Sequence, residues 1–341
     1  MPTQTESFVD FLENYGREHT PSMPLRAGDD AREWQGRFRD AVESLRGPVP
    51  PRVDPATEIV ESIQDEDHTR HLLRIRVSDA STLVAYLLIP NDIADGERRP
   101  GVIVSHGHAP HGIDSVCGVR GMDEGDGERR AYALHAVRAG YVALAPAWWG
   151  WAGRDGHLDR VGSRDRCNVI QMAAGMYGLN VLDLHIQDGQ AAIDALAARP
   201  EVDAGRIGCL GNSYGGRTAM WLTIFDDRIR ACVSAGAMNT FRERSLKLSS
   251  CGIQYLPGIL RYGDTPELFS LIAPRPLLLQ AGEVDGLITD GDRDHIDGTV
   301  RRVYADLEAS ASYDYQLHPS GHLLDWDMAA PFLATHLNHG R

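Results

Sequence analysis

Apolar residues recur at helical spacing in the first 46 residues. One stripe is formed by Phe8, Phe11, Leu12 and Tyr15, and a second by Trp34, Phe38, Val42 and Leu45. Apolar positions three or four residues apart lie on one side of a helix, so residues 5–46 are predicted to be helical, with both stripes packed against the main body. The proline-rich run at 48–51 then predicts a boundary between a helical extension over residues 1–50 and a main domain over residues 51–341.

The pattern changes twice after this break. Segments 58–63, 72–77 and 82–89 predict strands that pair antiparallel at one edge of a sheet. From residue 100 onward, short and fully apolar runs alternate with helical segments. The apolar runs are 102–105, 141–145, 207–210, 231–234 and 277–280, and the helical segments are 127–139, 181–198, 214–225, 293–309 and 326–338. Because strands covered on both faces are apolar throughout, the chain is predicted to be an α/β protein with a mostly parallel sheet.

Two segments are longer than ordinary connections in such a fold. Residues 147–180 contain a tryptophan cluster and a polar stretch, and residues 238–273 separate two predicted strands. Long insertions at the carboxyl ends of parallel strands commonly form binding sites. We expect these two insertions to form a cap and the walls of a pocket.

The charge balance narrows the range of partners. Asp and Glu number 48 against 34 Lys and Arg, a formal net charge of −14, which argues against nucleic acid and anionic membranes. The acidic N-terminus does not resemble a signal peptide, and no run approaches the ~18 apolar residues of a membrane helix. The five cysteines are widely spaced and lack a C-x-x-C pair, which indicates reduced, mostly buried thiols and a cytoplasmic location. The composition is compatible with a homo-oligomer.

The strongest chemical signal is the run Gly211-Asn212-Ser213-Tyr214-Gly215-Gly216, which fits the pattern G-x-S-x-G. A match to this pattern alone has little weight in a chain with 35 glycines. Its context gives it weight, because a predicted strand precedes it and a predicted helix follows it, which is the arrangement that a nucleophile elbow requires. Ser213 is therefore the candidate nucleophile.

A serine nucleophile needs a base, and in folds of this kind the acid and the histidine follow the serine along the chain. His322 lies in a loop directly after a predicted late strand, residues 313–317. His318, at the end of that strand, is the main rival. His295 falls within a predicted helix among acidic residues. His322 is the candidate base.

The acid is expected after the preceding strand. Residues 276–280 form that strand, and Asp285 lies in its exit loop. Glu283 is the nearest competitor, while Asp290 and Asp292 resemble solvated turn residues. Asp285 is the candidate that would hold the imidazole tautomer and stabilise the imidazolium.

The turn His106-Gly107-His108 follows the predicted strand 102–105. In this type of site a loop here gives one oxyanion-hole N–H, assigned to His108, and the residue after the nucleophile, Tyr214, gives the other. His106, His108 and His111 also form H-x-H-x-x-H, a potential metal site. Pro110 stands where the metallo-β-lactamase pattern has Asp, and no later cluster clearly completes such a site. We expect neither a metal nor a cofactor.

These motifs resemble the dienelactone hydrolase and acetyl xylan esterase-like branch of the α/β-hydrolases. The resemblance covers about residues 80–340 and rests on HGH, ARPEVDAGRIGCLGNSYGG, CGIQYLPGILRYGD, LIAPRPLLLQAGEVD and SGH. It implies the α/β-hydrolase fold and a carboxylic-ester hydrolase. GNSYGG is also similar to prolyl-oligopeptidase-like peptidases, but a propeller-sized N-terminal domain is not present in this sequence.

The sequence departs from this branch in two places. Ala147 stands where relatives often have Asp, and the loop after Asp285 lacks their usual proline. Three tryptophans and an arginine follow Ala147, and they either line a pocket or pack the cap onto the body; these residues are Trp148, Trp149, Trp151 and Arg154.

The predicted substrate is a small-molecule ester or lactone, cleaved by two-step acyl transfer. A peptidase or an acyltransferase could use the same three residues. A third alternative is a non-catalytic binding protein on this fold, although such a protein has no need to keep all three groups in order.

Overall fold

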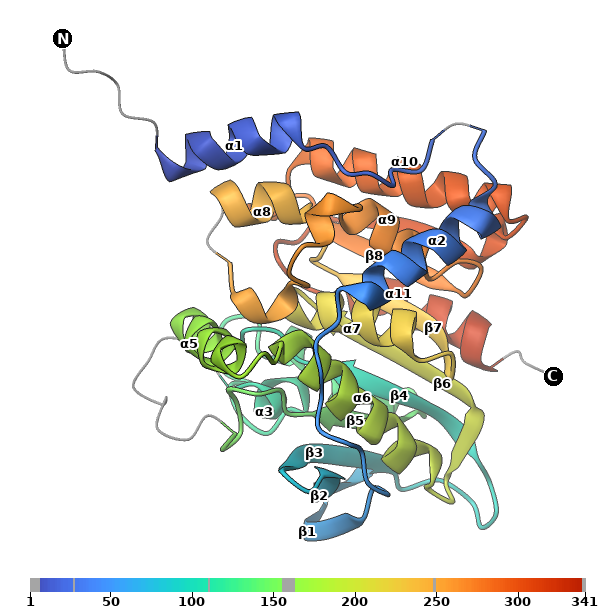
Figure 1. The fold of residues 1–341 in the computed structure, drawn as a ribbon. Coiled ribbons are helices and arrows are strands. Elements are labelled where there is room, and N and C mark those ends of the chain that lie inside the picture. Colours follow the sequence, from blue (N-terminus) through green and yellow to red (C-terminus); the bar gives the residue numbers. More distant parts are fainter. Residues whose placement is uncertain (1–6, 27, 110, 155–162, 248–249, 339–341) are drawn as a thin grey trace.

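A single twisted sheet organises the chain. The computed structural model describes residues 7–26, 28–109, 111–154, 163–247 and 250–338 (Figure 1). Within these ranges nine strands are arranged in the order β1-β2-β3-β5-β4-β6-β7-β8-β9. Their bounds are β1 Thr57–Gln64, β2 His68–Ser78, β3 Ser81–Pro90, β4 Arg99–Ser105, β5 Val142–Pro146, β6 Val202–Asn212, β7 Ile229–Ala235, β8 Leu277–Gly282 and β9 Tyr313–His318.

The direction of the strands agrees with the sequence pattern. Strands β1, β2 and β3 pair antiparallel at one edge, and β3 pairs antiparallel with β5. All neighbouring strands from β5 through β4, β6, β7 and β8 to β9 pair parallel. The prediction of an α/β fold with an antiparallel edge and a mostly parallel sheet is confirmed.

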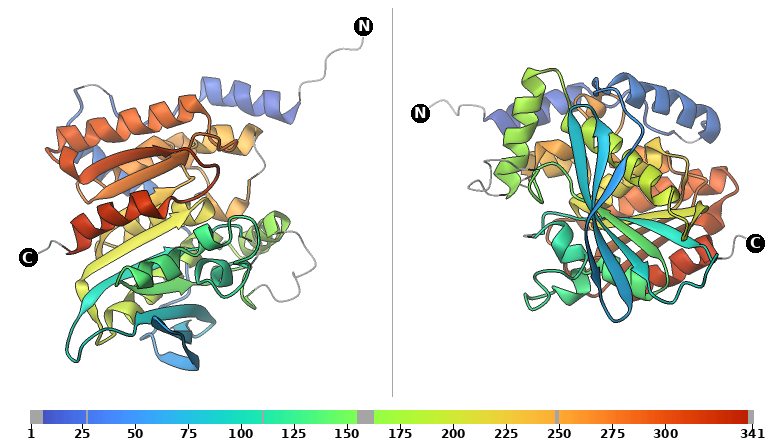
Figure 2. Two further views of the ribbon diagram at one scale, coloured as in Figure 1. Left: turned by 180° about the vertical axis from the view of Figure 1, so that it is seen from behind. Right: turned by 90° about the horizontal axis from the view of Figure 1, so that it is seen from below.

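Helices cover both faces of the sheet (Figure 2). The α-helices are α1 Phe8–Glu18, α2 Ala31–Ser44, α3 Ile113–Val116, α4 Tyr132–Arg138, α5 Ser163–Met176, α6 Val181–Ala197, α7 Tyr214–Phe225, α8 Phe241–Lys247, α9 Thr265–Ser270, α10 Asp290–Asp306 and α11 Trp326–Leu333. Short 3-10 turns are η1 Glu128–Arg130, η3 Gly252–Gln254, η4 Ile259–Arg261 and η5 Ser310–Ser312, and a π-helical turn, η6, spans Ala334–Asn338. None of the described helices is long and apolar enough to cross a bilayer.

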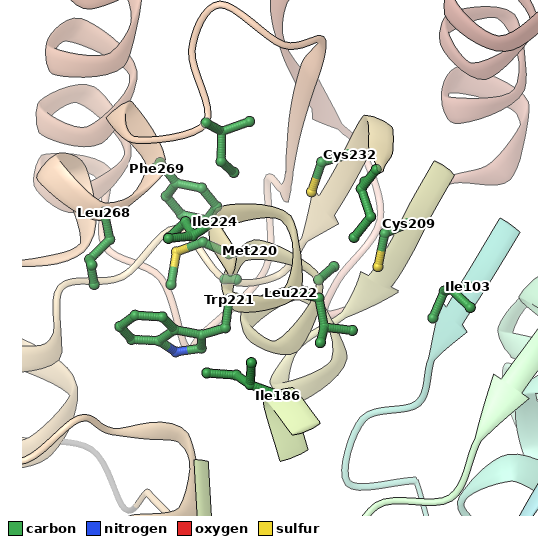
Figure 3. Packing of buried hydrophobic residues seen from close by; sticks show 14 of the residues in the cluster. Ile103, Ile186, Cys209, Met220, Trp221, Leu222, Ile224, Cys232, Leu268 and Phe269 are labelled. Carbon is green, nitrogen blue, oxygen red and sulfur yellow. The ribbon is translucent and has the colours of Figure 1, made fainter. Parts of the chain in front are cut away.

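Alternating strand residues supply two hydrophobic cores, one on each face. On β4, Ile103 belongs to the core that contains α2, α6, α7, α9 and α10, whereas Val102 and Val104 belong to the core with α4 and α11. Figure 3 shows the first core around α7, where Met220 and Trp221 lie near the side chains of α9. The two cores explain why the central strands are apolar at every position.

The N-terminal helices differ in their packing. On α2, Phe38 is fully buried and belongs to the main core, as predicted. On α1 the helix is present as predicted, but the prediction that its apolar stripe packs against the main body was wrong. No residue of α1 is buried, and Phe8 is 72% exposed. This helix lies on the surface beside α8 (Figure 1) and is only half-buried at Leu12. The proposed boundary near residue 50 stays a prediction.

Both insertions follow the carboxyl ends of parallel strands. Residues 147–180 follow β5 and contain α5, and residues 238–273 follow β7 and contain α8, η3, η4 and α9. The turn after β6 and the loop after β9 lie at the same edge, because these strands run parallel. Side chains from all four segments can therefore meet above the sheet.

Candidate active site

Ser213 occupies a strained turn between β6 and α7. Its φ is 63° and its ψ −124°, a backbone conformation that non-glycine residues rarely adopt. The Ser213 N–H donates to the carbonyl of Ala235 at 2.8 Å, and its carbonyl accepts from the N–H of Arg217 at 3.0 Å. Such strain costs about 1–3 kcal/mol and persists where the surroundings enforce it. The turn places Ser213 in the lining of a cavity.

Two glycines allow the backbone to close around this turn. A Cβ on Gly215 would lie 2.1 Å from the carbonyl oxygen of Ser105, and one on Gly211 would lie 2.5 Å from the carbonyl carbon of Gly215. Contacts this short cannot be relieved by side-chain movement, because the neighbouring atoms belong to the backbone. The small residues of the motif thus bring the end of β4 against the start of α7.

His322 and Asp285 form a hydrogen-bonded pair. The Nδ1 atom of His322 lies 2.7 Å from Oδ2 of Asp285, whose side chain is fully buried. The other carboxylate oxygen, Oδ1, accepts from the N–H of Leu287 at 2.9 Å. Burial raises the pKa of Asp285, but the hydrogen bonds from His322 and Leu287 and the charge of His322 outweigh it, so the pKa is lowered. Asp285 is therefore held as a carboxylate.

The second nitrogen of His322 is available for chemistry. Its Nε2 atom is buried and has no hydrogen-bond partner among the described residues. His322 lines the same cavity as Ser213, and a Cβ on Gly236 would lie only 3.0 Å from its Cε1 atom. The absence of a side chain at Gly236 therefore makes room for the imidazole beside the nucleophile.

The rival base and acid lie elsewhere. His318 is fully buried, and its Nε2 atom lies 3.1 Å from the carbonyl of Leu323, so this ring anchors the loop that carries His322. Glu283 is exposed and, like His318, does not line the cavity. The two rivals thus do not meet Ser213.

The cavity has a volume of about 200 Å³ and is lined by both polar and apolar residues. His108 and Tyr214, the predicted oxyanion donors, contribute to this lining. Tyr214 is the first residue of α7, so its N–H has no acceptor within the helix. Other residues of the lining were not predicted from the sequence; they include Arg130, Arg217, Asn239, Arg244 and Gln254.

The sequence could have identified Arg217 as a neighbour of the nucleophile, because it lies one helical turn after Ser213. It is buried, donates to Thr265 Oγ1 at 2.8 Å and to Asn239, and its guanidinium lies 4.3 Å from the ring centre of Phe241. Burial lowers its pKa to about 10, so the side chain stays charged at neutral pH. Arg217 ties the elbow helix to the insertion after β7.

The tryptophan cluster packs within the protein and contributes no residue to the lining of this cavity, which favours the second of its two predicted roles. Trp148, Trp149, Trp151 and Arg154, all within the described residues, do not line the cavity. Trp148 is fully buried, and its indole donates to Ser105 Oγ at 3.0 Å. Trp151 stacks on the ring of Tyr214 with 6.0 Å between ring centres. These rings pack the insertion onto the sheet and support the residues that do line the cavity.

Arg154 is buried and forms an ion pair with a buried carboxylate. Its side chain is 5% exposed and donates to Asp188 Oδ2 at 2.7 Å, and its guanidinium lies 3.8 Å from the ring centre of Trp149. Burial raises the pKa of Asp188, although the charge of Arg154 opposes this effect. Each residue of this pair thus neutralises the charge of the other beneath the insertion.

The histidine run divides into separate environments. His106 is fully buried, which lowers its pKa to about 4, and its ring nitrogens contact the carbonyl of Gly107 and the N–H of Trp148. His111 pairs with Glu124 at 3.3 Å. Among the described residues, His108 is the histidine of this run that lies in a group of three potential metal ligands, and the other two are cysteines that the sequence did not connect with it.

All five cysteines are free and buried, as the sequence predicted. Cys167 Sγ lies 3.4 Å from Nε2 of His108, and Cys251 completes the group. The hydrogen bond with Cys167, together with His108, lowers the pKa of Cys251 against the effect of burial. These residues lie far apart in the chain, so no local spacing reveals the cluster.

The fold is that of the α/β-hydrolases, and comparisons with known proteins agree. A structure from Bacteroides fragilis NCTC 9343, to which acetyl xylan esterase activity is attributed, superposes with a TM-score of 0.81 at 17% identity over 97% of this chain and 95% of its own. A glucuronoyl esterase from Solibacter usitatus superposes with a TM-score of 0.67 at 16% identity over 93% and 97%. At these identities the likeness establishes the fold.

Sequence comparison establishes the family. Residues 85–313 match the dienelactone hydrolase family. YtaP of Bacillus subtilis (strain 168), to which hydrolase activity is attributed, is 27% identical over 289 residues, which are 83% of this chain and 92% of YtaP. The protein belongs to the dienelactone hydrolase family and is a hydrolase of the carboxylic-ester class.

Proposed function

We propose that the protein hydrolyses small carboxylic esters or lactones through an acyl-enzyme on Ser213. One observation carries the proposal. A single cavity is lined by a serine in a strained elbow and by a histidine whose Nε2 atom is unpartnered among the described residues, while Asp285 holds its Nδ1 atom. This is the order of groups that nucleophilic acyl transfer requires.

In the first step, His322 Nε2 accepts the proton of Ser213 as Oγ attacks the carbonyl carbon. The backbone N–H groups of His108 and Tyr214 bind the carbonyl oxygen as it becomes negative, and Asp285 stabilises the imidazolium. The tetrahedral intermediate collapses, and His322 protonates the departing alcohol oxygen. Water, deprotonated by His322, then attacks the acyl-enzyme and releases the acid with Ser213 restored.

The size and polarity of the cavity support a small substrate. Its volume of about 200 Å³ lies below the roughly 300–1,000 Å³ of drug-sized pockets. Its lining includes Arg130, Arg217 and Arg244, and no Asp or Glu among the described residues. A short acyl group on a polar alcohol suits such a site, which is the substrate class that the attribution of the Bacteroides fragilis structure indicates.

Hydrolysis of 4-nitrophenyl acetate, butyrate and octanoate by the purified protein tests this proposal. We expect kcat/KM to fall as the acyl chain lengthens, and Ser213→Ala to lower it by about 10⁴-fold or more. Ser62→Ala, in the fully exposed strand β1, is the matched control and should retain activity. Activity that survives Ser213→Ala would refute the proposed nucleophile.

Analysis of the products separates hydrolysis from transfer. With an added alcohol acceptor, a hydrolase releases mainly the free acid, whereas an acyltransferase forms mainly the new ester. A predominance of the new ester at low acceptor concentration would replace the hydrolase by the acyltransferase alternative.

A further inference from the structure

Three sulfur and nitrogen ligands converge beside the candidate active site. They are His108, after β4, Cys167 on α5, and Cys251, immediately before η3. One ring nitrogen of His108 and the two Sγ atoms all lie within 4.8 Å of one another, and Nε2 of His108 lies 3.4 Å from Sγ of Cys167. Three separate segments therefore deliver one donor atom each to the same point.

The spacing suits a tetrahedral ion. With Zn–S near 2.3 Å and Zn–N near 2.0 Å, tetrahedral angles place the donor atoms about 3.5–3.8 Å apart. The contact of 3.4 Å between His108 and Cys167 is close to this separation, and the remaining distances require movements of about 1 Å at most. Side-chain rotation is enough for such movements.

The surroundings favour binding over chance proximity. Cys167 and Cys251 are 0% and 1% exposed, so water competes little for the ion. The ring of His108 packs against the rings of Trp151 and Tyr214, whose centres lie 5.5 Å and 5.1 Å away. Ordered ligands lose little conformational freedom when they bind a metal.

The donor set also selects the ion. Two thiols and one imidazole match the preference of Zn²⁺ and other thiophilic ions, whereas Mg²⁺ and Ca²⁺ prefer oxygen. The neighbouring histidines do not belong to this set, because both nitrogens of His106 are engaged and His111 pairs with Glu124.

We propose that His108, Cys167 and Cys251 bind one Zn²⁺ ion, with the fourth coordination position directed toward the cavity that Ser213 lines. This direction is inferred from the lining, since His108 and Cys251 line the cavity whereas Cys167 does not. Three protein ligands and one position for water or a small anion form an open zinc site. This proposal is independent of acyl transfer at Ser213.

The test uses the untagged full chain, reduced and stripped of metal with a chelator. Titration with Co²⁺ should produce thiolate-to-metal charge transfer in the near ultraviolet and the intense visible bands of a tetrahedral site. Zn²⁺ should abolish these bands at one ion per chain. Metal analysis after dialysis against Zn²⁺ should also give one ion per chain.

Cysteine variants localise the site. Cys167→Ser and Cys251→Ser should each lose the charge-transfer band, while Cys117→Ser, a buried cysteine in the opposite core, should keep it. Far-ultraviolet circular dichroism verifies that each variant is folded. The spectrum of the unaltered protein remains decisive if a variant does not fold.

Three results would overturn the proposal. They are a Co²⁺ spectrum without thiolate charge transfer in the reduced protein, an unchanged spectrum in folded Cys167→Ser and Cys251→Ser, and a reduced protein that binds no Zn²⁺. A Cys167–Cys251 disulfide that forms on exposure to peroxide, without metal binding by the reduced protein, would assign the cluster to redox chemistry instead.

Discussion

The carboxylate of Asp285 provides a sharp test of the proposed mechanism. In Asp285→Asn, the new amide keeps the shape of the side chain. The hydrogen bond from Leu287 N–H to Oδ1, at 2.9 Å, should hold the amide oxygen in that position. The amide NH₂ then faces His322 Nδ1, 2.7 Å from the former Oδ2. As an NH₂ group can only donate, it forces the imidazole proton onto Nε2, which can no longer accept the proton of Ser213.

The expected loss in kcat is about 10⁴-fold, as for the corresponding change in the general Ser-His-Asp triad, or roughly 5 kcal/mol of transition-state stabilisation. Steady-state hydrolysis of 4-nitrophenyl acetate measures it, with thermal unfolding as a check on the fold. Glu283→Gln is the matched control, because this exposed carboxylate lies in the same loop and should change kcat less than about twofold. A kcat of Asp285→Asn within tenfold of that of the unaltered protein would contradict the proposed role of Asp285.

Three further predictions concern stability. Phe38→Ala should lower the free energy of unfolding by about 3–5 kcal/mol, whereas Phe8→Ala on exposed α1 should change it by less than about 0.5 kcal/mol; urea denaturation of both variants tests this difference. Arg154→Ala should cost about 3–5 kcal/mol because Asp188 loses its buried partner, while KM in the folded variant stays unchanged; a raised KM with unaltered stability would return Arg154 to the pocket. His106 binds a proton near pH 6.5 when unfolded and near pH 4 when folded, so the free energy of unfolding should fall by about 3 kcal/mol between pH 7 and pH 4 on its account. Urea denaturation at both pH values should show a weaker dependence in His106→Gln, and an equal dependence would contradict the role of this residue.

Much of the fold could be predicted because it depends on the local pattern of apolar and polar residues. The run at 207–210 is apolar at every position, and β6 is indeed covered by a core on each face. The positions of Ser213, Asp285 and His322 followed from the ends of strands, because parallel strands direct their carboxyl ends to one edge of the sheet. The amphipathic pattern of α1 led to a wrong prediction of burial, because an apolar stripe does not show whether another surface is available to cover it.

What the sequence could not predict depends on contacts between distant segments. The orientation of Trp148 and Trp151 toward the sheet follows from how their insertion folds back, and nothing in WWGW determines that direction. The contact of His108 with Cys167 likewise joins a loop after β4 to a helix in an insertion. Arg217 is intermediate, because its helical position was predictable and its partners were not.

Active-site labelling measures directly whether Ser213 is the nucleophile. The purified protein is treated with a fluorophosphonate, digested and analysed by mass spectrometry. We expect one phosphonyl group, on the peptide that carries Ser213, and much slower labelling in Asp285→Asn. Labelling at another serine, or equal labelling of Ser213→Ala, would contradict the assignment of Ser213 as the nucleophile.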